Sequence, residues 1–149
     1  MTLYDELWAL ISRLNKAKIS YALCGGLAMA AHGWPRATMD IDMLIEEKNL
    51  EPARKIARSL GFKHEPGHMV FCNGQINIRR LVKFDGEEII PLDLLIVTLA
   101  LQSVWKQRSE LLLEHGKIWV VSTEGLKAMK KMRKSGQDQD DIRKLRGDI

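Results

Sequence analysis

Two aspartates, separated by one residue, interrupt an otherwise apolar segment between Met39 and Ile45. Apart from Asp40 and Asp42, the residues of this segment predict a β-strand. Side chains two positions apart in a strand project from the same face, so the two carboxylates would lie side by side. Such like charges repel and shift each other's pKa unless a cation lies between them. Because Mg²⁺ prefers carboxylate oxygens, the pair predicts a site for a divalent cation.

A third acid, Asp93, interrupts the apolar run Ile89–Val97. A buried carboxylate is costly without a partner, so Asp93 either caps a backbone amide, pairs with an arginine, or serves a functional site. If its strand lies beside the one with Asp40 and Asp42, the three acids could hold two Mg²⁺ ions about 4 Å apart. One ion would then activate an attacking hydroxyl, and the other would hold a triphosphate and stabilise the departing pyrophosphate.

Gly25 and Gly26 stand between a predicted strand and a predicted short helix. Most Gly-Gly pairs are tight turns. At the start of a helix, however, unpaired backbone amides favour anions, and glycine has no Cβ to keep a phosphate away. The position of the pair one helix upstream of the acids favours a phosphate site. His32, at the other end of this helix, either reaches a phosphate or complements the helix dipole.

The elements that must position these residues follow from the periodicity of apolar residues and from turn signals. Asn73-Gly74 and Asp85-Gly86 predict hairpin turns. The pattern predicts one α+β domain over residues 1–149, in which helices flank a mixed central sheet and a C-terminal helical pair forms an appendage over about 123–146. The predicted helices are 3–16, 27–32, 51–60, 99–108, 123–134 and 138–145, and the predicted strands are 19–24, 39–45, 69–72, 76–84, 88–97 and 117–121.

The composition is typical of a globular protein of one domain, with 46% hydrophobic and 28% charged residues among 149. The 23 basic and 19 acidic residues give a net charge of +4, which suits an anionic partner such as a nucleotide or RNA. We expect Cys24 and Cys72, both in apolar contexts, to be buried and reduced in a cytoplasmic protein. No apolar run is long enough to span a membrane.

The order of these features resembles a known family. A strand, Gly25-Gly26, a short helix and Asp40-x-Asp42, followed by an apolar strand with Asp93, is similar to the nucleotidyltransferase superfamily with the polymerase-β-like fold. The segment from Gly25 to Asp42 is especially similar to small prokaryotic members, which include minimal enzymes and the abortive-infection toxin type.

Two further stretches carry the resemblance. Arg36 and Thr38 match an arginine and a threonine that precede the two acids in those relatives, and residues 126–145 resemble their C-terminal helical motif. The chain departs from that motif at Ser135, where many relatives have an arginine. Arg133 and Lys134 are the candidates to replace it.

The resemblance implies a site in which acids bind metal and glycines and basic residues contact the nucleotide. The implied catalytic and metal-binding residues are Asp40, Asp42 and Asp93, and the implied nucleotide-binding residues are Gly25, Gly26, Arg36, Thr38 and Lys130.

The sequence thus predicts an enzyme that uses two Mg²⁺ ions to transfer a nucleoside monophosphate from a nucleoside triphosphate to a hydroxyl of an RNA such as tRNA, a protein or a small molecule. Two alternatives remain. The chain could be a binding module of this fold, acting on a partner in a toxin–antitoxin pair, or a basic RNA-binding domain with structural acids. A basic stretch over residues 127–146 is either a solvated helix face or a surface for RNA. Because the chain leaves little room for an acceptor-binding domain, a homodimer or a second protein could complete the site.

Overall fold

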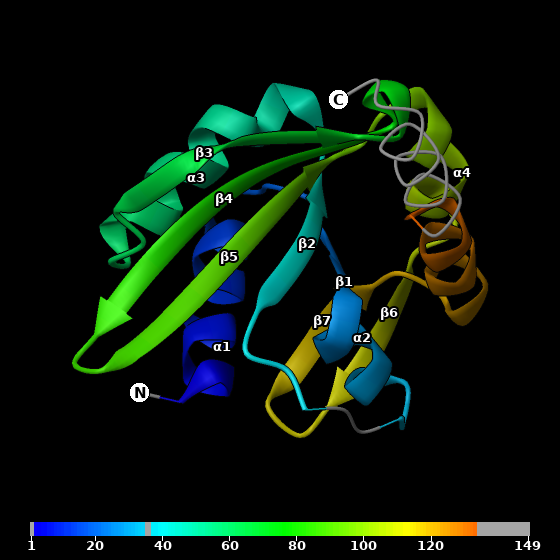
Figure 1. The fold of residues 1–149 in the computed structure, drawn as a ribbon. Coiled ribbons are helices and arrows are strands. Elements are labelled where there is room, and N and C mark those ends of the chain that lie inside the picture. The colour runs from blue at the N-terminus through cyan, green and yellow to red at the C-terminus, as the bar shows by residue number, and fades with distance from the viewer. Residues whose placement is uncertain (1, 35–36, 134–149) are drawn as a thin grey trace.

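The computed structural model describes residues 2–34 and 37–133. These residues form a seven-stranded mixed sheet with the strand order β3-β4-β5-β2-β1-β7-β6 (Figure 1). The strands are β1 (Ala22–Cys24), β2 (Ile41–Ile45), β3 (His64–Phe71), β4 (Ile76–Asp85), β5 (Glu88–Ile96), β6 (Ser109–Leu113) and β7 (Gly116–Val120). The helices are α1 (Leu3–Lys16), α2 (Gly25–Ala31), α3 (Leu50–Ser59), α4 (Gln102–Lys106) and a last one over residues 123–133, with short 3₁₀ turns η1 (Glu47–Asn49), η2 (Cys72–Gly74) and η3 (Leu99–Leu101).

The acid-bearing strand β2 lies in the middle of the sheet. It pairs in parallel with β5 and antiparallel with β1, and β1 in turn pairs in parallel with β7. Hairpins join β3 to β4, β4 to β5, and β6 to β7. A central strand has partners on both sides, so the position of its side chains is fixed by two ladders of hydrogen bonds.

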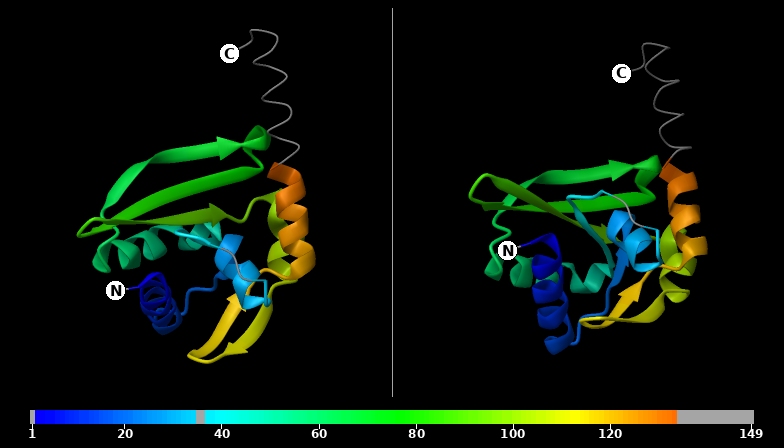
Figure 2. Two further views of the ribbon diagram at one scale, coloured as in Figure 1. Left: turned by 60° about the horizontal axis from the view of Figure 1, so that its bottom comes forward. Right: turned by 90° about the horizontal axis from the view of Figure 1, so that it is seen from below.

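Helices cover the two faces of the sheet unequally. Helices α1 and α3 lie on one face of the sheet (Figure 2). They share a core with alternate residues of β2 and β5, such as Met43 and Leu94. On the other face, α4 and the 123–133 helix bury Leu44 and Leu95 in a second, smaller core. Because neighbours along a strand point to opposite faces, Asp42 and Asp93 share the face of this second core.

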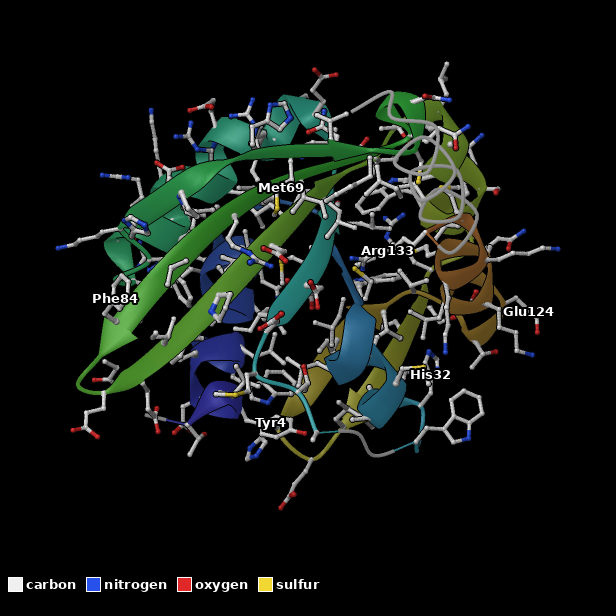
Figure 3. All side chains as sticks on the ribbon, viewed as in Figure 1. Tyr4, His32, Met69, Phe84, Glu124 and Arg133 are labelled. Carbon is white, nitrogen blue, oxygen red and sulfur yellow. The ribbon has the colours of Figure 1, made fainter. Side chains whose placement is uncertain are left out.

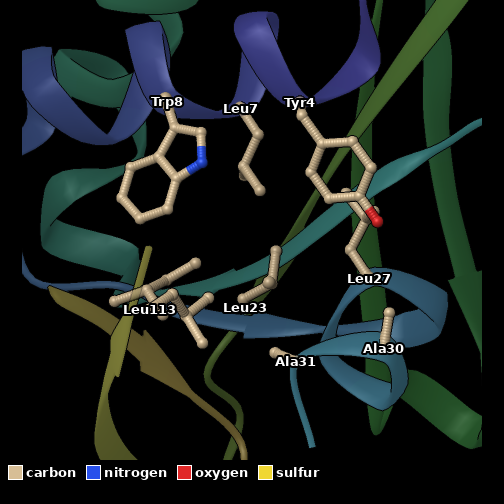
Figure 4. A pocket seen from close by; sticks show the side chains of 9 residues that line it. Tyr4, Leu7, Trp8, Leu23, Leu27, Ala30, Ala31 and Leu113 are labelled. Atoms are coloured by element: carbon tan, nitrogen blue, oxygen red, sulfur yellow. The ribbon is translucent and has the colours of Figure 1, made fainter. Parts of the chain in front are cut away.

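The first helix is defined by local signals. Thr2 caps it and forms a reciprocal capping box with Asp5, while Leu7, Leu10 and Leu14 are buried. Between α1, α2 and the β6–β7 hairpin lies an apolar cavity of about 160 Å³ (Figure 4). Leu23 and Leu27, which line it, belong to the core on the α1 side, so this cavity lies apart from the acids.

The predicted elements are found with some corrections. Strand β6 was not predicted, and β1 has three residues instead of the expected six. Gly25 and Gly26 are the first residues of α2, whereas the sequence predicted a turn before a helix that starts at Leu27. Asp40 precedes β2 instead of lying within it. The predicted helix 138–145, the second member of the C-terminal pair, lies outside the described residues.

Two other expectations concern the cysteines and the membrane. Both cysteines are free thiols, but only Cys24 is buried, and Cys72 is half-buried at the end of β3. Within residues 2–34 and 37–133, no helix combines the length and the apolar character that a membrane span requires.

Candidate active site

The parallel pairing of β2 and β5 brings two of the predicted acids together. Asp42 lies directly opposite Asp93 in the register of the two strands, which are about 4.8 Å apart in a sheet of this kind. Asp40, two residues before Asp42, contributes to the electrostatic field at that carboxyl group. The expectation that the strand of Asp93 lies beside that of Asp40 and Asp42 is therefore confirmed.

Arg80 of β4 pairs with Asp93 on the same sheet face. Its Nε donates to Asp93 Oδ1 at 2.7 Å and its second terminal nitrogen donates to Oδ2 at 2.9 Å. The Asp93 side chain is 6% exposed and that of Arg80 is 35% exposed. Pairing of Asp93 with an arginine was the structural alternative for this acid, and the structure contains that pair. Asp93 also lies opposite Asp42, so the Arg80–Asp93 ion pair lies directly beside that acid.

The carboxyl group of Asp42 is held in an unfavourable environment for a charge. Burial, with the neighbouring Asp93 and Asp40, raises its pKa to about 7 from an ordinary value of 3.8. Arg133 and Arg80 oppose this shift but do not cancel it. A carboxyl group with such a pKa needs an additional positive charge to be fully ionised near neutral pH.

Gly25 and Gly26 allow β2 and the preceding loop to approach the start of α2. A Cβ on Gly25, which has φ of +67°, would overlap the carboxylate of Asp42. A Cβ on Gly26 would be 2.9 Å from Cβ of Thr38. The two glycines therefore have a packing role that the sequence did not reveal: they place backbone directly against two other predicted site residues.

A cavity of about 740 Å³ opens beside these residues. The 123–133 helix forms one wall with Leu126, Met129, Lys130 and Arg133, which recur at the spacing of one helical face. Arg133 extends from this helix towards the start of α2 (Figure 3). The cavity combines apolar surface with both acidic and basic groups and has the size of a small-molecule site. Its lining residues are Cys24, Gly25, Gly26, Met29, Ala37, Thr38, Asp42, Leu95, Leu126, Met129, Lys130 and Arg133.

The structure thus brings five of the eight predicted site residues to one cavity. These are Gly25, Gly26, Thr38, Asp42 and Lys130. Asp40 and Asp93 adjoin Asp42, and Arg36 lies outside the described residues. His32 does not serve this site in the structure, because its Nε2 lies 2.8 Å from the carbonyl oxygen of Val121.

Sequence reasoning assigned no role at the acids to Arg80 and named Arg133 only as a substitute for a missing arginine. The β4–β5 hairpin sets which residue faces Asp93, but the turn signal in the sequence did not give the register that places Arg80 there. For Arg133, the signal was its spacing of three residues from Lys130 and seven from Leu126 on one helix.

The acids fit a divalent cation in part. The pKa of Asp42 is raised first by burial and then by the charges of Asp93 and Asp40, so a cation beside Asp42 would favour its ionised form. The oxygens of Asp93, in contrast, are engaged by Arg80. Within the part of the chain that the structure describes, no three acidic, histidine or cysteine side chains form a ready cluster for a metal ion. Asp40 and Asp42 remain as the candidate ligands of a cation, and a ligand role for Asp93 requires Arg80 to release it.

Comparison with known proteins identifies the fold. No protein-family model and no curated protein matches the chain. The crystal structure of TM1012 from Thermotoga maritima, provisionally assigned as a nucleotidyltransferase, matches with a TM-score of 0.68 and 15% identity over 100% of this chain and 97% of that chain. The aminoglycoside nucleotidyltransferase ANT(2″)-Ia, solved in complex with adenylyl-2″-tobramycin, matches with a TM-score of 0.57 and 14% identity over 80% of this chain and 69% of that chain. The chain therefore shares the fold of these proteins, as the sequence predicted.

Proposed function

We propose that this protein is a Mg²⁺-dependent nucleotidyltransferase, which transfers a nucleoside monophosphate from a nucleoside triphosphate to a hydroxyl group and releases pyrophosphate. One observation carries the proposal: Asp42, with a pKa raised to about 7 by burial and by two neighbouring acids, lies at a cavity that Lys130 and Arg133 also line. Acids whose charge is only partly balanced, next to basic groups in a concave site, suit a complex of metal and polyphosphate.

The residues of the site would have different roles in this reaction. Lys130 and Arg133 would bind the phosphates, and Gly25 and Gly26 keep the backbone close to the acids. Asp40 and Asp42 would hold Mg²⁺, with Asp93 as the ligand that a second ion shares. When bound, the metal supplies charge neutralisation for the leaving pyrophosphate and a lower pKa for the acceptor hydroxyl.

The acceptor is a hydroxyl group of a small molecule, a protein or an RNA. The structural relative ANT(2″)-Ia was solved with adenylyl-2″-tobramycin, which makes an aminoglycoside one acceptor to test.

The proposal is tested by incubating the protein with Mg²⁺, each α-³²P-labelled nucleoside triphosphate and, separately, tobramycin, cellular RNA or cellular protein. We expect label transfer that stops with EDTA and with Asp42→Asn. The matched control is Glu47→Gln, which also neutralises one acid but at an exposed position in η1. Transfer that persists in Asp42→Asn, or its absence with every nucleotide and acceptor, would contradict the proposal.

A second candidate is a nucleotide-binding partner protein of the same fold, without catalysis, as in one half of a toxin–antitoxin pair. The Arg80–Asp93 pair favours it, because an engaged Asp93 is not a free metal ligand. Nucleotide binding that ignores Mg²⁺, with no transfer to any acceptor, would support this candidate over the enzyme.

A further inference from the structure

Arg80 holds the acid that the proposed function requires for a second metal ion. Its two hydrogen bonds to Asp93, of 2.7 and 2.9 Å, use both carboxylate oxygens. The planar guanidinium matches a carboxylate in this two-point manner, whereas an ammonium group does not.

The position of the pair links it to the other acids. Arg80 lies opposite Asp93 in the β4–β5 ladder, and Asp93 lies opposite Asp42 in the β5–β2 ladder. Arg80 also has a raised pKa, caused first by its hydrogen bonds to Asp93 and further by the charges of Asp93, Asp40 and Asp42. Its guanidinium is therefore a counter-charge of this acidic group, beside the charge of Arg133, which also acts on Asp42. A dication on Asp93 would lie close to the guanidinium, and the two positive charges would repel each other.

We propose that Arg80 is a positioning residue that reserves Asp93, so that the nucleotide-free protein binds one divalent cation at Asp40 and Asp42. The second cation is bound only when Arg80 releases Asp93. This inference rests on the proposed function for the role of the acids as metal ligands.

The test counts Mn²⁺ ions bound per folded chain by electron paramagnetic resonance, without nucleotide and without any assay of activity. We expect one bound ion for the wild-type protein and two for Arg80→Met. Loss of hydrogen bonds to a charged group changes an equilibrium by at least about tenfold, so the second site should tighten by at least that factor. The double variant Arg80→Met with Asp93→Asn should return to one ion.

Two controls separate the reservation of Asp93 from a simple change of charge. Arg79→Met removes the same charge from the neighbouring position of β4, but Arg79 pairs with Leu94 and so faces the α1 side of the sheet. We expect it to bind one ion. Arg80→Lys keeps the charge without the two-point contact and should bind a second ion more tightly than the wild-type protein. Arg80→Lys also decides the question if Arg80→Met fails to fold.

The outcomes distinguish this inference from the proposed function. Two ions in the wild-type protein, or one ion in both Arg80→Met and Arg80→Lys, would overturn the role of Arg80 and leave the proposed function standing. Failure of the wild-type protein and of both variants to bind any Mn²⁺ would overturn both. A second ion in Arg79→Met as well would show a general charge effect and overturn the inference.

Discussion

Burial and two neighbouring carboxylates oppose the charge of Asp42 more strongly than Arg133 and Arg80 favour it. The pKa of its carboxyl group is about 7 in the folded protein, against an ordinary value of 3.8. Between these two pH values the folded protein therefore keeps a proton on Asp42 that the unfolded chain has released. The site is therefore under electrostatic strain whenever no cation is bound. A metal ion would relieve that strain and release the proton.

This strain has a measurable dependence on pH. Between pH 4 and 7 the unfolded chain binds fewer protons than the folded one at Asp42, so the unfolding free energy of the metal-free protein should fall as pH rises. One pKa unit is worth about 1.4 kcal/mol, and contact of Asp42 with the solvent of the cavity reduces the effect, so we expect a loss of about 1–3 kcal/mol. Urea denaturation in EDTA at a series of pH values measures it. Asp42→Asn should flatten the curve in this window.

Glu47→Gln is the control, because it removes an exposed carboxyl group and should leave the slope unchanged. An Asp42→Asn curve parallel to the wild-type curve would show that Asp42 titrates normally. The premise that burial and the neighbouring acids disfavour the charge of Asp42 would then be wrong.

The role of Arg80 depends on one detail of a turn. The sequence predicted a hairpin at Asp85-Gly86, and a two-residue turn centred there would place Ile78 opposite Asp93. In the structure Asp85 pairs with Glu88, so Gly86 and Glu87 form the turn and Arg80 faces Asp93. The pattern of residues identified the hairpin, but a shift of one residue in the turn moves the register by two. Such a shift decides which residue meets the acid.

At the scale of elements, α2 and β2 meet without space for another atom at Gly25. Gly25→Ala places a Cβ into the Asp42 carboxylate and also forces alanine to a φ of +67°. Gly33→Ala forces a comparable φ of +94°, but its Cβ would have nothing within 4 Å. The φ penalty alone is about 1–2 kcal/mol. We expect Gly33→Ala to lose that amount in unfolding free energy and Gly25→Ala to lose at least about 1 kcal/mol more.

Binding of Mn²⁺ and of nucleotide also distinguishes the two glycine variants. Gly33→Ala should bind Mn²⁺ and nucleotide as the wild-type protein does, whereas Gly25→Ala should bind Mn²⁺ more weakly, because Asp42 has to move. Equal losses of stability and of metal binding in the two variants would show that the contact between Gly25 and Asp42 has no role beyond backbone conformation.

The 123–133 helix presents one basic face to the cavity and others to solvent. Lys130 and Arg133 line the cavity, whereas Lys131 does not. A charged hydrogen bond to phosphate is worth about 1.5–3 kcal/mol. We expect Lys130→Gln and Arg133→Gln each to weaken binding of a nucleoside triphosphate by about tenfold or more in calorimetric titrations. Lys131→Gln, with the same loss of charge, should weaken it by less than about threefold. Three equal losses would indicate general attraction by a basic helix.

The elements were predicted to different degrees for physical reasons. Helix α1 has a capping box and a regular apolar face, so its bounds agree with the prediction. Strand β6 contains Leu111, Leu112 and Leu113, good helix formers without β-branching, and it becomes a strand through pairing with β7. The extension of β3 back to His64 likewise comes from its pairing with β4, across an irregular register that includes Gly67.

At the scale of the whole molecule, the strand order is set by contacts that a local pattern does not contain. The parallel pairing of β2 with β5, which joins the acids, connects segments about fifty residues apart and was expected only from the resemblance and from the cost of burying Asp93.

An ion pair between Glu6 of α1 and Lys83 of β4, at 2.7 Å, is a second long-range contact that the local pattern does not contain. Glu6 is 1% exposed. Lys83 also lies over the ring of Phe62, at 6.0 Å from its centroid.

We expect the buried pair of Glu6 and Lys83 to fix how α1 packs on the sheet and to add little to the unfolding free energy. Lys83→Met leaves a buried, unpaired carboxylate, so we expect a loss of about 3 kcal/mol in unfolding free energy. The double variant Glu6→Met with Lys83→Met removes both charges and should lie within about 1 kcal/mol of the wild-type protein, or above it. Urea denaturation of the two single variants and the double variant, as a double-mutant cycle, measures the coupling.

The exposed pair of Lys117 and Glu110, at 4.0 Å, provides the control, and Lys117→Met should change stability by less than about 0.5 kcal/mol. Because Lys83 pairs with Ile90 and so faces the α1 side of the sheet, Mn²⁺ binding at the acids should be unchanged in every folded variant of this cycle. A double variant that is less stable than both single variants would show that Glu6 and Lys83 stabilise the molecule independently. In that case the contact between α1 and β4 would depend on each charge by itself, and the ion pair would not be what connects them.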